Sequence, residues 1–417
     1  MNKLEPRIRF DEFYDEWNKN KIKNISEKIK SYSVSRKYET KESTGLKYVH
    51  YGDIHTDVAD IVKKDNDLPF VDYKKAKECL ENGDLVIADA SEDYDGIANA
   101  CLIKDIDEKI IAGLHTIALR LSSEISPLYF YYLTKSEKFK KFCIIMATGA
   151  KVYGITYNNI ANYILDLPDK EEQEKIGAFF EKLDKLIENQ ESYLNLNKKL
   201  KKSLLQKLFP KEGEDRPELR FPGFKDDWKE YKLKNICESY GGSALEKEFT
   251  SDGSYKVISI GSYGINSKYI DQGIRTNLNK KTKSKLLNKD DLVMILNDKT
   301  SSGDIIGRVL LIDKSDTYIY NQRSQRIILS KGFDSNFFYQ MFNSNKRDKI
   351  RKIVQGNTQI YVNWKSVSNL NYLIPTLEEQ EKIGLLFKSL DEKIESEEKK
   401  LRAYKDFKKS MLQKMFV

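Results

Sequence analysis

Side chains that can read nucleic-acid bases gather in three short stretches of this 417-residue chain, at 297–303, 321–326 and 355–361. Arginine can bond two acceptors of guanine at once, asparagine and glutamine can do the same with adenine, and serine and threonine suit several bases. Taken alone, each stretch is equally consistent with a solvated loop. The candidate contact residues are Asn297, Lys299, Thr300, Ser301, Ser302, Gln322, Arg323, Gln325, Gln355, Asn357, Thr358 and Gln359.

The first half of the chain has a matching stretch at 148–153, which contributes Thr148, Lys151 and Tyr153. Because polar stretches fall at corresponding places in both halves, we favour a binding role over solvated loops. Three further candidates, with a weaker signal, are Lys104, His115 and Thr116.

A basic run at 346–352 includes Arg347 and Arg351. If the chain binds nucleic acid, we expect these two side chains to contact phosphate, which strengthens binding without reading sequence.

Catalytic and metal-binding motifs are missing from the sequence. There is no pair of adjacent prolines, which excludes the Asn/Asp-Pro-Pro-aromatic signature of amino-methyltransferases, and no phosphate-binding loop of an ATPase. His50 and His55 are five residues apart, a poor ligand spacing, and the four cysteines form no CxxC pair. We therefore expect no catalytic residue and no metal site.

Composition indicates an ordered protein, with 40% hydrophobic and 33% charged residues. No apolar run approaches the ~20 residues that span a bilayer, so we expect no membrane partner. Scattered cysteines fit a reducing cytoplasm, which is the predicted location. The net charge of +8 is uneven, since residues 211–374 carry +8 and residues 1–167 carry −2. A basic second domain suggests a polyanionic partner.

The sequence contains an internal duplication. Residues 171–177 (EEQEKIG) recur unchanged at 378–384, and the surrounding 42-residue blocks share 23 identities. A lead-in with the pattern Arg-Phe, Phe, Trp precedes each half, at residues 9–17 and 220–228. The chain should therefore be two copies of one plan.

Between the shared segments, each half predicts one mixed α+β domain. Apolar runs after turn residues predict buried strands at 85–88 and 292–295, with later strands at 117–121 and 326–329. Helices are expected at 127–146 and 336–354.

Each repeated block predicts one long helix of about 39 residues, or about 58 Å. Thr376 with Glu379, and Asp169 with Glu172, fit a capping box at the two helix starts. A narrow apolar seam predicts a coiled coil in which each helix pairs, antiparallel, with the other copy. A six-residue step, to Leu200 and to Phe407, should shift the seam's phase. Alternatively, each helix caps its own domain, which requires a wider apolar stripe.

With its duplicated P-x-x-x-E-Q-x-x-I block, at Pro168 to Ile176 and Pro375 to Ile383, the chain resembles specificity subunits of type I restriction-modification systems over essentially its full length. The resemblance implies an α+β fold: two mixed α/β target-recognition domains separated by two long antiparallel coiled-coil helices, in a pseudo-two-fold repeat. The expected divisions are 1–167 and 211–374 for the recognition domains, and 168–210 and 375–417 for the spacer helices.

The resemblance also implies that each recognition domain reads one half of a split double-stranded DNA target. Two modification subunits and two restriction subunits would be partners, and S-adenosylmethionine, ATP and Mg²⁺ would bind to them and not to this chain. The alternatives are a coiled-coil scaffold with protein-binding heads and an unfamiliar nuclease. Residues expected to build the spacer and dock partner subunits are Glu172, Gln173, Ile176, Phe180, Leu183, Ile187, Glu379, Gln380, Ile383, Phe387, Leu390 and Ile394.

Overall fold

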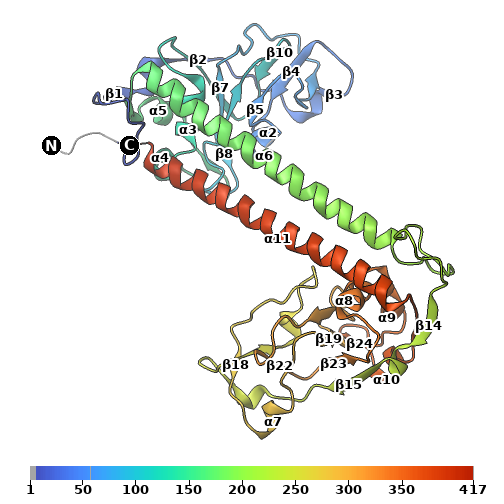
Figure 1. The fold of residues 1–417 in the computed structure, drawn as a ribbon. Helices are drawn as coiled ribbons and strands as arrows, with labels where there is room; N and C mark the ends of the chain where they lie inside the picture. Colours follow the sequence, from blue (N-terminus) through green and yellow to red (C-terminus); the bar gives the residue numbers. More distant parts are fainter. Residues whose placement is uncertain (1–5, 57, 417) are drawn as a thin grey trace. The chain divides into compact units, whose positions relative to one another are not determined.

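The computed structural model describes residues 6–56 and 58–416 and divides the chain into two compact units (Figure 1). Unit 1 runs to Glu191 and also includes the chain from Lys399 onward, whereas unit 2 is Ser192–Glu398. Two long helices, α6 (Lys170–Lys207) and α11 (Leu377–Lys414), each contribute residues to both units.

Unit 1 contains two main sheets. The first has the strand order β2-β11-β7-β9-β5 and the second β10-β4-β6-β3. Two small ribbons, β1-β13 and β8-β12, complete the sheet structure that the described residues form. The strands are β1 (Asn18–Lys21), β2 (Ser26–Ile29), β3 (Glu39–Thr40), β4 (Leu46–Val49), β5 (Ile61–Val62), β6 (Phe70–Val71), β7 (Leu85–Ala88), β8 (Ala90–Ser91), β9 (Ala100–Ile103), β10 (Lys109–Ala112), β11 (Thr116–Leu121), β12 (Tyr153–Gly154) and β13 (Ile164–Leu167). Its shorter helices are α1 (Ile22–Ile25), η1 (Arg36–Tyr38), α2 (Tyr51–His55), α3 (Pro127–Thr134), α4 (Glu137–Met146) and α5 (Tyr157–Ala161).

Unit 2 repeats this plan with the sheets β15-β23-β19-β21 and β22-β17-β18-β16 and the ribbons β14-β25 and β20-β24. The strands are β14 (Lys229–Lys232), β15 (Cys237–Gly241), β16 (Phe249–Thr250), β17 (Tyr255–Ile258), β18 (Arg275–Thr276), β19 (Leu292–Ile295), β20 (Asn297–Asp298), β21 (Val309–Leu311), β22 (Tyr318–Tyr320), β23 (Ser324–Leu329), β24 (Ile360–Tyr361) and β25 (Asn371–Ile374). The helices are η2 (Leu233–Asn235), η3 (Glu246–Glu248), η4 (Ile260–Ser262), α7 (Lys280–Lys283), α8 (Ser335–Asn343), η5 (Asn345–Arg347), α9 (Asp348–Arg351) and α10 (Trp364–Ser368).

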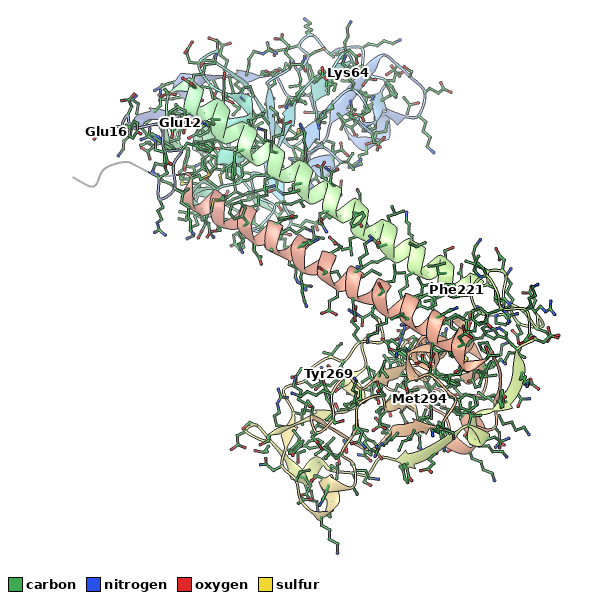
Figure 2. All side chains as sticks on the ribbon, in the orientation of Figure 1. Glu12, Glu16, Lys64, Phe221, Tyr269 and Met294 are labelled. Atoms are coloured by element: carbon green, nitrogen blue, oxygen red, sulfur yellow. The ribbon has the colours of Figure 1, made fainter. Side chains whose placement is uncertain are left out.

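The two units share one topology, apart from the additional edge strand β5 in unit 1, although their variable regions share little sequence. In each, the only parallel pair of the second sheet joins corresponding strands, β4 with β10 and β17 with β22. The buried strands predicted at 85–88 and 292–295 are confirmed as β7 and β19. Met294, labelled in Figure 2, lies in β19. Matching strand order confirms that the duplication extends through the variable regions.

The two helices predicted after the sheets were wrong in one respect, because each is interrupted. The segment 127–146 forms α3 and α4, and Ser136 caps the second helix by accepting a hydrogen bond from the backbone N of Phe139 (3.3 Å). The segment 336–354 likewise breaks at Ser344, whose hydroxyl accepts from the backbone N of Lys346 (3.2 Å). In both places a serine side chain offers the backbone a local partner that competes with the continuous helix.

The start of each long helix departs from the predicted capping box. Asp169 Oδ1 does accept from the backbone N of Glu172 (2.8 Å) and so caps α6. The carboxylate of Glu172, however, accepts from Arg9 and from Trp17 Nε1 (3.1 Å). In unit 2 the carboxylate of Glu379 accepts from Arg220 in the same way. The glutamates therefore bind the lead-in segments and not the helix ends.

Gln173 and Gln380, the next residues of the repeated block, tie the long helix to the domain. Gln173 Oε1 accepts from the backbone N of Ser126, and its Nε2 donates to the carbonyl of Pro168, both at 3.0 Å. Gln380 makes the same pair of bonds with Asp334 and Pro375, again at 3.0 Å. All four Glu and Gln side chains are buried, which explains why this dipeptide is identical in both copies.

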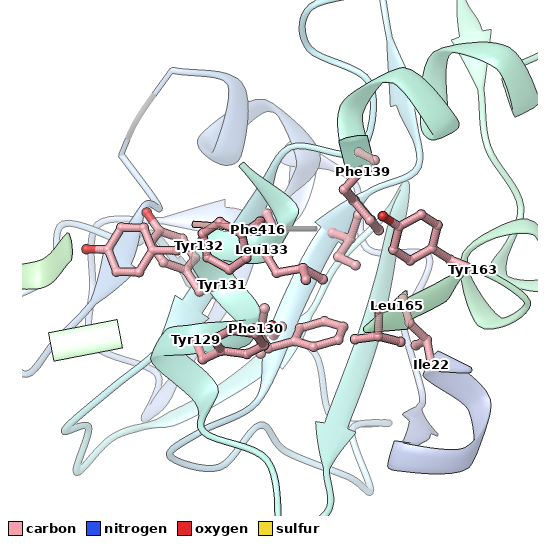
Figure 3. Packing of buried hydrophobic residues seen from close by; sticks show 14 of the residues in the cluster. Ile22, Tyr129, Phe130, Tyr131, Tyr132, Leu133, Phe139, Tyr163, Leu165 and Phe416 are labelled. Carbon is pink, nitrogen blue, oxygen red and sulfur yellow. The ribbon is translucent and has the colours of Figure 1, made fainter. Parts of the chain in front are cut away.

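The predicted antiparallel helix pairing is present within each unit. In unit 1 the first half of α6 packs on the last part of α11, where the rings of Phe179 and Phe407 are 6.4 Å apart, and just past the end of α11 the ring of Phe416 stacks on that of Phe180 at 5.8 Å. In unit 2 the rings of Phe387 and Phe209 are 6.3 Å apart in the same arrangement. Phe416 thus completes the core of unit 1 beside Tyr129 and Tyr132 (Figure 3). Each long helix both caps its own domain and pairs with its copy.

The phase shift predicted for the seam is wrong. Leu200 and Phe407 are each 47% exposed, whereas Asn197 and Glu397 are buried. The seam of α6 therefore keeps heptad spacing through polar residues, as Leu194, Asn197, Lys201, Leu204 and Leu208.

Two lysines in this seam meet aspartates of the partner helix. Lys201 Nζ lies 2.6 Å from Asp391 Oδ1 in unit 2, and Lys408 pairs with Asp184 in unit 1. Charged pairs of this kind can replace apolar residues at a coiled-coil seam and fix its register. No helix among the described residues is long and apolar enough to cross a membrane.

Candidate nucleic-acid interface

The three polar stretches of unit 2 meet around one cavity of about 350 Å³, called here the unit 2 hollow. They meet because β20 pairs with β24, and because β23 begins beside the end of β19. Segments separated by more than 60 residues in sequence thereby share one surface. The lining residues are Glu246, Phe249, Ser259, Ile260, Asn297, Asp298, Lys299, Asn321, Gln322, Arg323 and Gln359.

The stretch 355–361 is a hairpin closed by hydrogen bonds in both directions between the backbones of Gln355 and Tyr361 (2.8 and 2.9 Å). Gly356 has φ +97°, and a Cβ there would lie 2.2 Å from the carbonyl oxygen of Gln359. Only glycine fits such a turn. Asn357, Thr358 and Gln359 are exposed at its tip, so their side chains are available to a ligand.

Hydrogen bonds hold the polar side chains at the hollow. Gln322 Nε2 donates to Glu246 Oε1 (2.6 Å), and Asn321 Nδ2 donates to the same atom (2.9 Å). With its amide oxygen toward Arg323, Asn297 accepts from Arg323 Nη1 (2.7 Å). These contacts position Arg323 beside the base-reading candidates.

The loop after β20 is held by Asp298, whose Oδ1 accepts from the backbone N and the hydroxyl of Thr300 (both 3.0 Å). The hydroxyls of Thr300 and Ser302 lie 2.8 Å apart. Lys299 and Ser301 are exposed on the same loop. The loop is therefore ordered by its own side chains and keeps exposed donors.

Three arginines donate hydrogen bonds to the backbone carbonyls of this loop. Arg308 Nε and Arg347 Nη1 both donate to the carbonyl of Asp304 (2.7 Å), and Arg351 Nη2 donates to the carbonyl of Ser302 (3.3 Å). Burial, together with the positive charges of Arg308 and Arg351, lowers the pKa of Arg347 to about 10. Such a concentration of positive charge suits a phosphate group.

Unit 1 has a counterpart of the hairpin, formed where β8 pairs with β12. Thr148 and Gly154 exchange backbone hydrogen bonds (3.0 and 2.8 Å), as Gln355 and Tyr361 do in unit 2. Gly149 has φ +135°, and a Cβ there would lie 1.9 Å from the carbonyl oxygen of Val152. Lys151 is exposed at the tip, and the ring of Tyr153 stacks on that of Tyr94 at 4.0 Å.

All three histidines of the chain lie around Tyr51 in unit 1. The ring centroids of His50, His115 and His55 are 4.5, 5.3 and 5.8 Å from that of Tyr51. His115 Nδ1 lies 3.2 Å from Asp89 Oδ1, and burial raises the pKa of that aspartate. Sequence spacing had separated these histidines, because β4 and β11 belong to two different sheets that only the tertiary structure brings together.

Three sequence-predicted residues lie away from exposed surface or are engaged elsewhere. Thr116 and Gln325 are each 6% exposed. Lys104 Nζ pairs with Glu181 Oε1 on α6 (2.5 Å). Residues that the sequence reasoning missed include Tyr51, Tyr94, Glu246 and Arg308, and their only sequence signal was polarity.

Most of the residues predicted to build the spacer and dock partners are buried within their unit; Leu390 is half-buried. Their spacer and docking roles stay a prediction, and exposed residues of the same helices would have to supply most of a partner's contact surface. No group of three His, Cys, Asp or Glu residues in 6–56 and 58–416 is placed to hold a metal ion.

Fold and surface together define a protein with an internal repeat that presents a similar polar surface twice. The family model for the type I restriction modification DNA specificity domain matches residues 14–198 and again 225–403. The chain belongs to this family, and it carries the domain twice.

Two curated relatives come from Methanocaldococcus jannaschii. The MjaVIII specificity subunit is 25% identical over 293 residues, 68% of each chain. The putative MjaX specificity subunit is 22% identical over 420 residues, covering 97% of this chain and 94% of that one. The crystal structure of the type I restriction-modification S subunit from M. genitalium has the same fold, with a TM-score of 0.63, 16% identity and 99% of both chains covered.

Proposed function

We propose that this chain is the DNA-recognition subunit of a type I restriction-modification complex and performs no chemistry itself. Each recognition domain would read one half of a split double-stranded target, and partner subunits would methylate adenine and cut. The observation that supports this most is the meeting of three separate polar stretches at the unit 2 hollow, with a matching hairpin in unit 1.

The proposal keeps the domain boundaries predicted from the sequence, with recognition domains at 1–167 and 211–374 and spacer helices at 168–210 and 375–417. It assigns two modification and two restriction subunits as partners, which would hold S-adenosylmethionine, ATP and Mg²⁺. Their substrate is cellular DNA, so the complex would act in the cytoplasm.

Within the site, the exposed hairpin and loop residues would contact bases, and the arginines beneath the loop would contact phosphate. The base-contact assignment covers Asn297, Lys299, Thr300, Ser301, Ser302, Gln322, Arg323, Asn357, Thr358 and Gln359 in unit 2, with Gln355 at the hairpin base. In unit 1 it covers His115, Thr148, Lys151 and Tyr153.

The test is to produce the chain with its modification subunit in a host without other adenine methylation, and to map methylated adenines across the genome. A split motif with two constant halves is the expected result. Exchanging residues 211–374 for those of another family member should change one half only. A continuous motif, no methylation, or a change in both halves would contradict the proposal.

A further inference from the structure

His115 and Arg323 occupy the same place in the two units. Each is the residue immediately before the second strand in the order of the first sheet, β11 or β23. The carbonyl of His115 accepts from the backbone N of Asp89 (3.1 Å), and that of Arg323 accepts from the backbone N of Leu296 (2.8 Å). Asp89 and Leu296 are themselves equivalent, since each follows the buried strand β7 or β19.

The backbone at this place is left-handed, with φ +56° at His115 and +71° at Arg323. For a residue other than glycine this conformation costs about 1–2 kcal/mol. Three other left-handed positions also have an equivalent in the other unit, as their matching hydrogen bonds and strand registers show. Each of these equivalent pairs contains at least one glycine. These pairs are Gly83 with Asp290, Ala98 with Gly307, and Gly149 with Gly356.

At the fourth position neither copy uses glycine, and both carry a long polar side chain instead. Both units keep a strained left-handed backbone at this position, although glycine, which adopts it without strain, is used at the other three. This points to a requirement for the side chain. The two side chains also differ, whereas a position that only supports the shared fold would be expected to keep the same residue in both units.

Both side chains face the candidate interface. Arg323 is exposed and lines the unit 2 hollow beside Asn297 and Gln359. The His115 side chain is 51% exposed and lies against the ring of Tyr51. Tyr51 corresponds to Ile260, which lines the hollow in unit 2. The correspondence of Tyr51 with Ile260 follows from their caps, because His50 and Ser259 begin the short helices after β4 and β17.

We infer that Arg323 and His115 are specificity-determining residues, one for each half of the DNA target, and that Arg323 reads a guanine. The inference rests on the proposed function and adds which residues separate the two half-sites. Arginine donates two hydrogen bonds to the O6 and N7 acceptors that only guanine presents together in the major groove. The Asp89 carboxylate, 3.2 Å from His115 Nδ1, favours the tautomer with its proton on Nδ1, in which Nε2 is an acceptor for the amino group of adenine or cytosine.

Glycine substitutions separate this role from folding. Because glycine adopts left-handed backbone without strain, Arg323→Gly and His115→Gly remove the reading group and leave the local backbone conformation favoured. Asp290→Gly is the matched control, since Asp290 has φ +68° and lies in the turn before β19 and away from the hollow. All three variants should unfold near the wild-type midpoint temperature, because the relieved backbone strain offsets the lost side-chain contacts.

The experiment uses the complex of the full chain with its modification subunit and sequences the methylated adenines. Arg323→Gly should lose the preference for guanine at one position of one half-site, by about 5- to 150-fold, with the other half unchanged. His115→Gly should relax one position of the other half-site, and Asp290→Gly should keep the wild-type motif.

The outcomes separate this inference from the proposed function. A wild-type complex without a split motif would defeat the proposed function. The inference would be overturned if the wild-type complex has a split motif and Arg323→Gly leaves it intact. It would also be overturned if Arg323→Gly lowers methylation uniformly with the same base preferences, because that is the effect of losing a phosphate contact.

Discussion

Arg9 donates two parallel hydrogen bonds to Glu172, Nε to Oε1 and Nη2 to Oε2, each 2.8 Å long. The two residues are 163 positions apart, and Glu172 is fully buried. Arg220 and Glu379 repeat the arrangement in unit 2 at 2.7 and 2.8 Å. Each lead-in is therefore bound to the start of a long helix by a bidentate arginine–carboxylate pair, one of the strongest hydrogen-bonded contacts between side chains.

Removing the charge of Glu172 should destabilise unit 1 strongly. Glu172→Gln breaks a bidentate pair whose carboxylate is fully buried, and losing one partner of a buried ion pair typically costs about 3–5 kcal/mol. Urea unfolding should show this as a lower midpoint. Glu12→Gln is the control (Glu12 is labelled in Figure 2), because its pair with Lys175 is exposed on both sides and should contribute little.

Glu379→Gln should cost less than Glu172→Gln. Glu172 also accepts from Trp17 Nε1, whereas the Nε1 of Trp228, the equivalent tryptophan, is buried with no hydrogen-bond partner. Equal losses of stability in the two variants would show that the tryptophan bond contributes nothing.

The last residue of the repeated EEQEKIG sequence should tolerate no side chain. A Cβ on Gly177 would lie 2.9 Å from the backbone N of Tyr129, and one on Gly384 would lie 2.9 Å from the backbone N of Phe337. Alanine normally stabilises a helix by up to about 1 kcal/mol relative to glycine. Here we expect Gly177→Ala and Gly384→Ala to destabilise by about 1–3 kcal/mol through overpacking, measured by thermal unfolding. A gain in stability would mean that α6 can shift away from α3, or α11 away from α8.

Buried tyrosines should make the protein unfold at alkaline pH. Burial raises the pKa of Tyr320 to about 12 and that of Tyr372 and Tyr132 further. Because the folded pKa lies above the unfolded value near 10, this stability is fully present below pH 10 and is lost as pH rises toward the folded pKa. Circular dichroism and tyrosinate absorbance should therefore change together above pH 10. Ionisation of these tyrosines without unfolding would contradict the expectation.

Two of these tyrosines should respond oppositely to loss of the hydroxyl. The hydroxyl of Tyr372 is buried with no hydrogen-bond partner, so Tyr372→Phe should be neutral or stabilise by about 1 kcal/mol. The hydroxyl of Tyr132 donates to Asp184 Oδ2 (2.8 Å), and Tyr132→Phe should destabilise by about 1.5–3 kcal/mol. Denaturant unfolding at pH 7 distinguishes the two.

Arg351 should act on DNA affinity and not on sequence choice. In Arg351→Ala, binding of the assembled complex should weaken equally for all sequences, and the slope of log affinity against log salt should fall by about 1. Arg216→Ala is the control, since Arg216 pairs with Asp227 in the second lead-in, where Phe221 is labelled in Figure 2. A change in target sequence would instead assign Arg351 to base reading.

The sequence by itself determined the duplication, the buried strands, the two long helices and their antiparallel pairing. These depend on local pattern: a run of apolar residues after a turn, or a seam repeating along a helix, is visible in adjacent residues. It also placed the polar hairpins at corresponding positions in the two halves.

Only the tertiary structure decided which polar residues are internal. Lys201 belongs to the seam because Asp391 is opposite, and Glu172 is buried because Arg9 reaches it. No local pattern reports a partner nearly two hundred residues away. The left-handed backbone at His115 and Arg323 was equally invisible, because sequence predicts such a conformation from glycine, and here it is the surrounding sheet that imposes it on other residues.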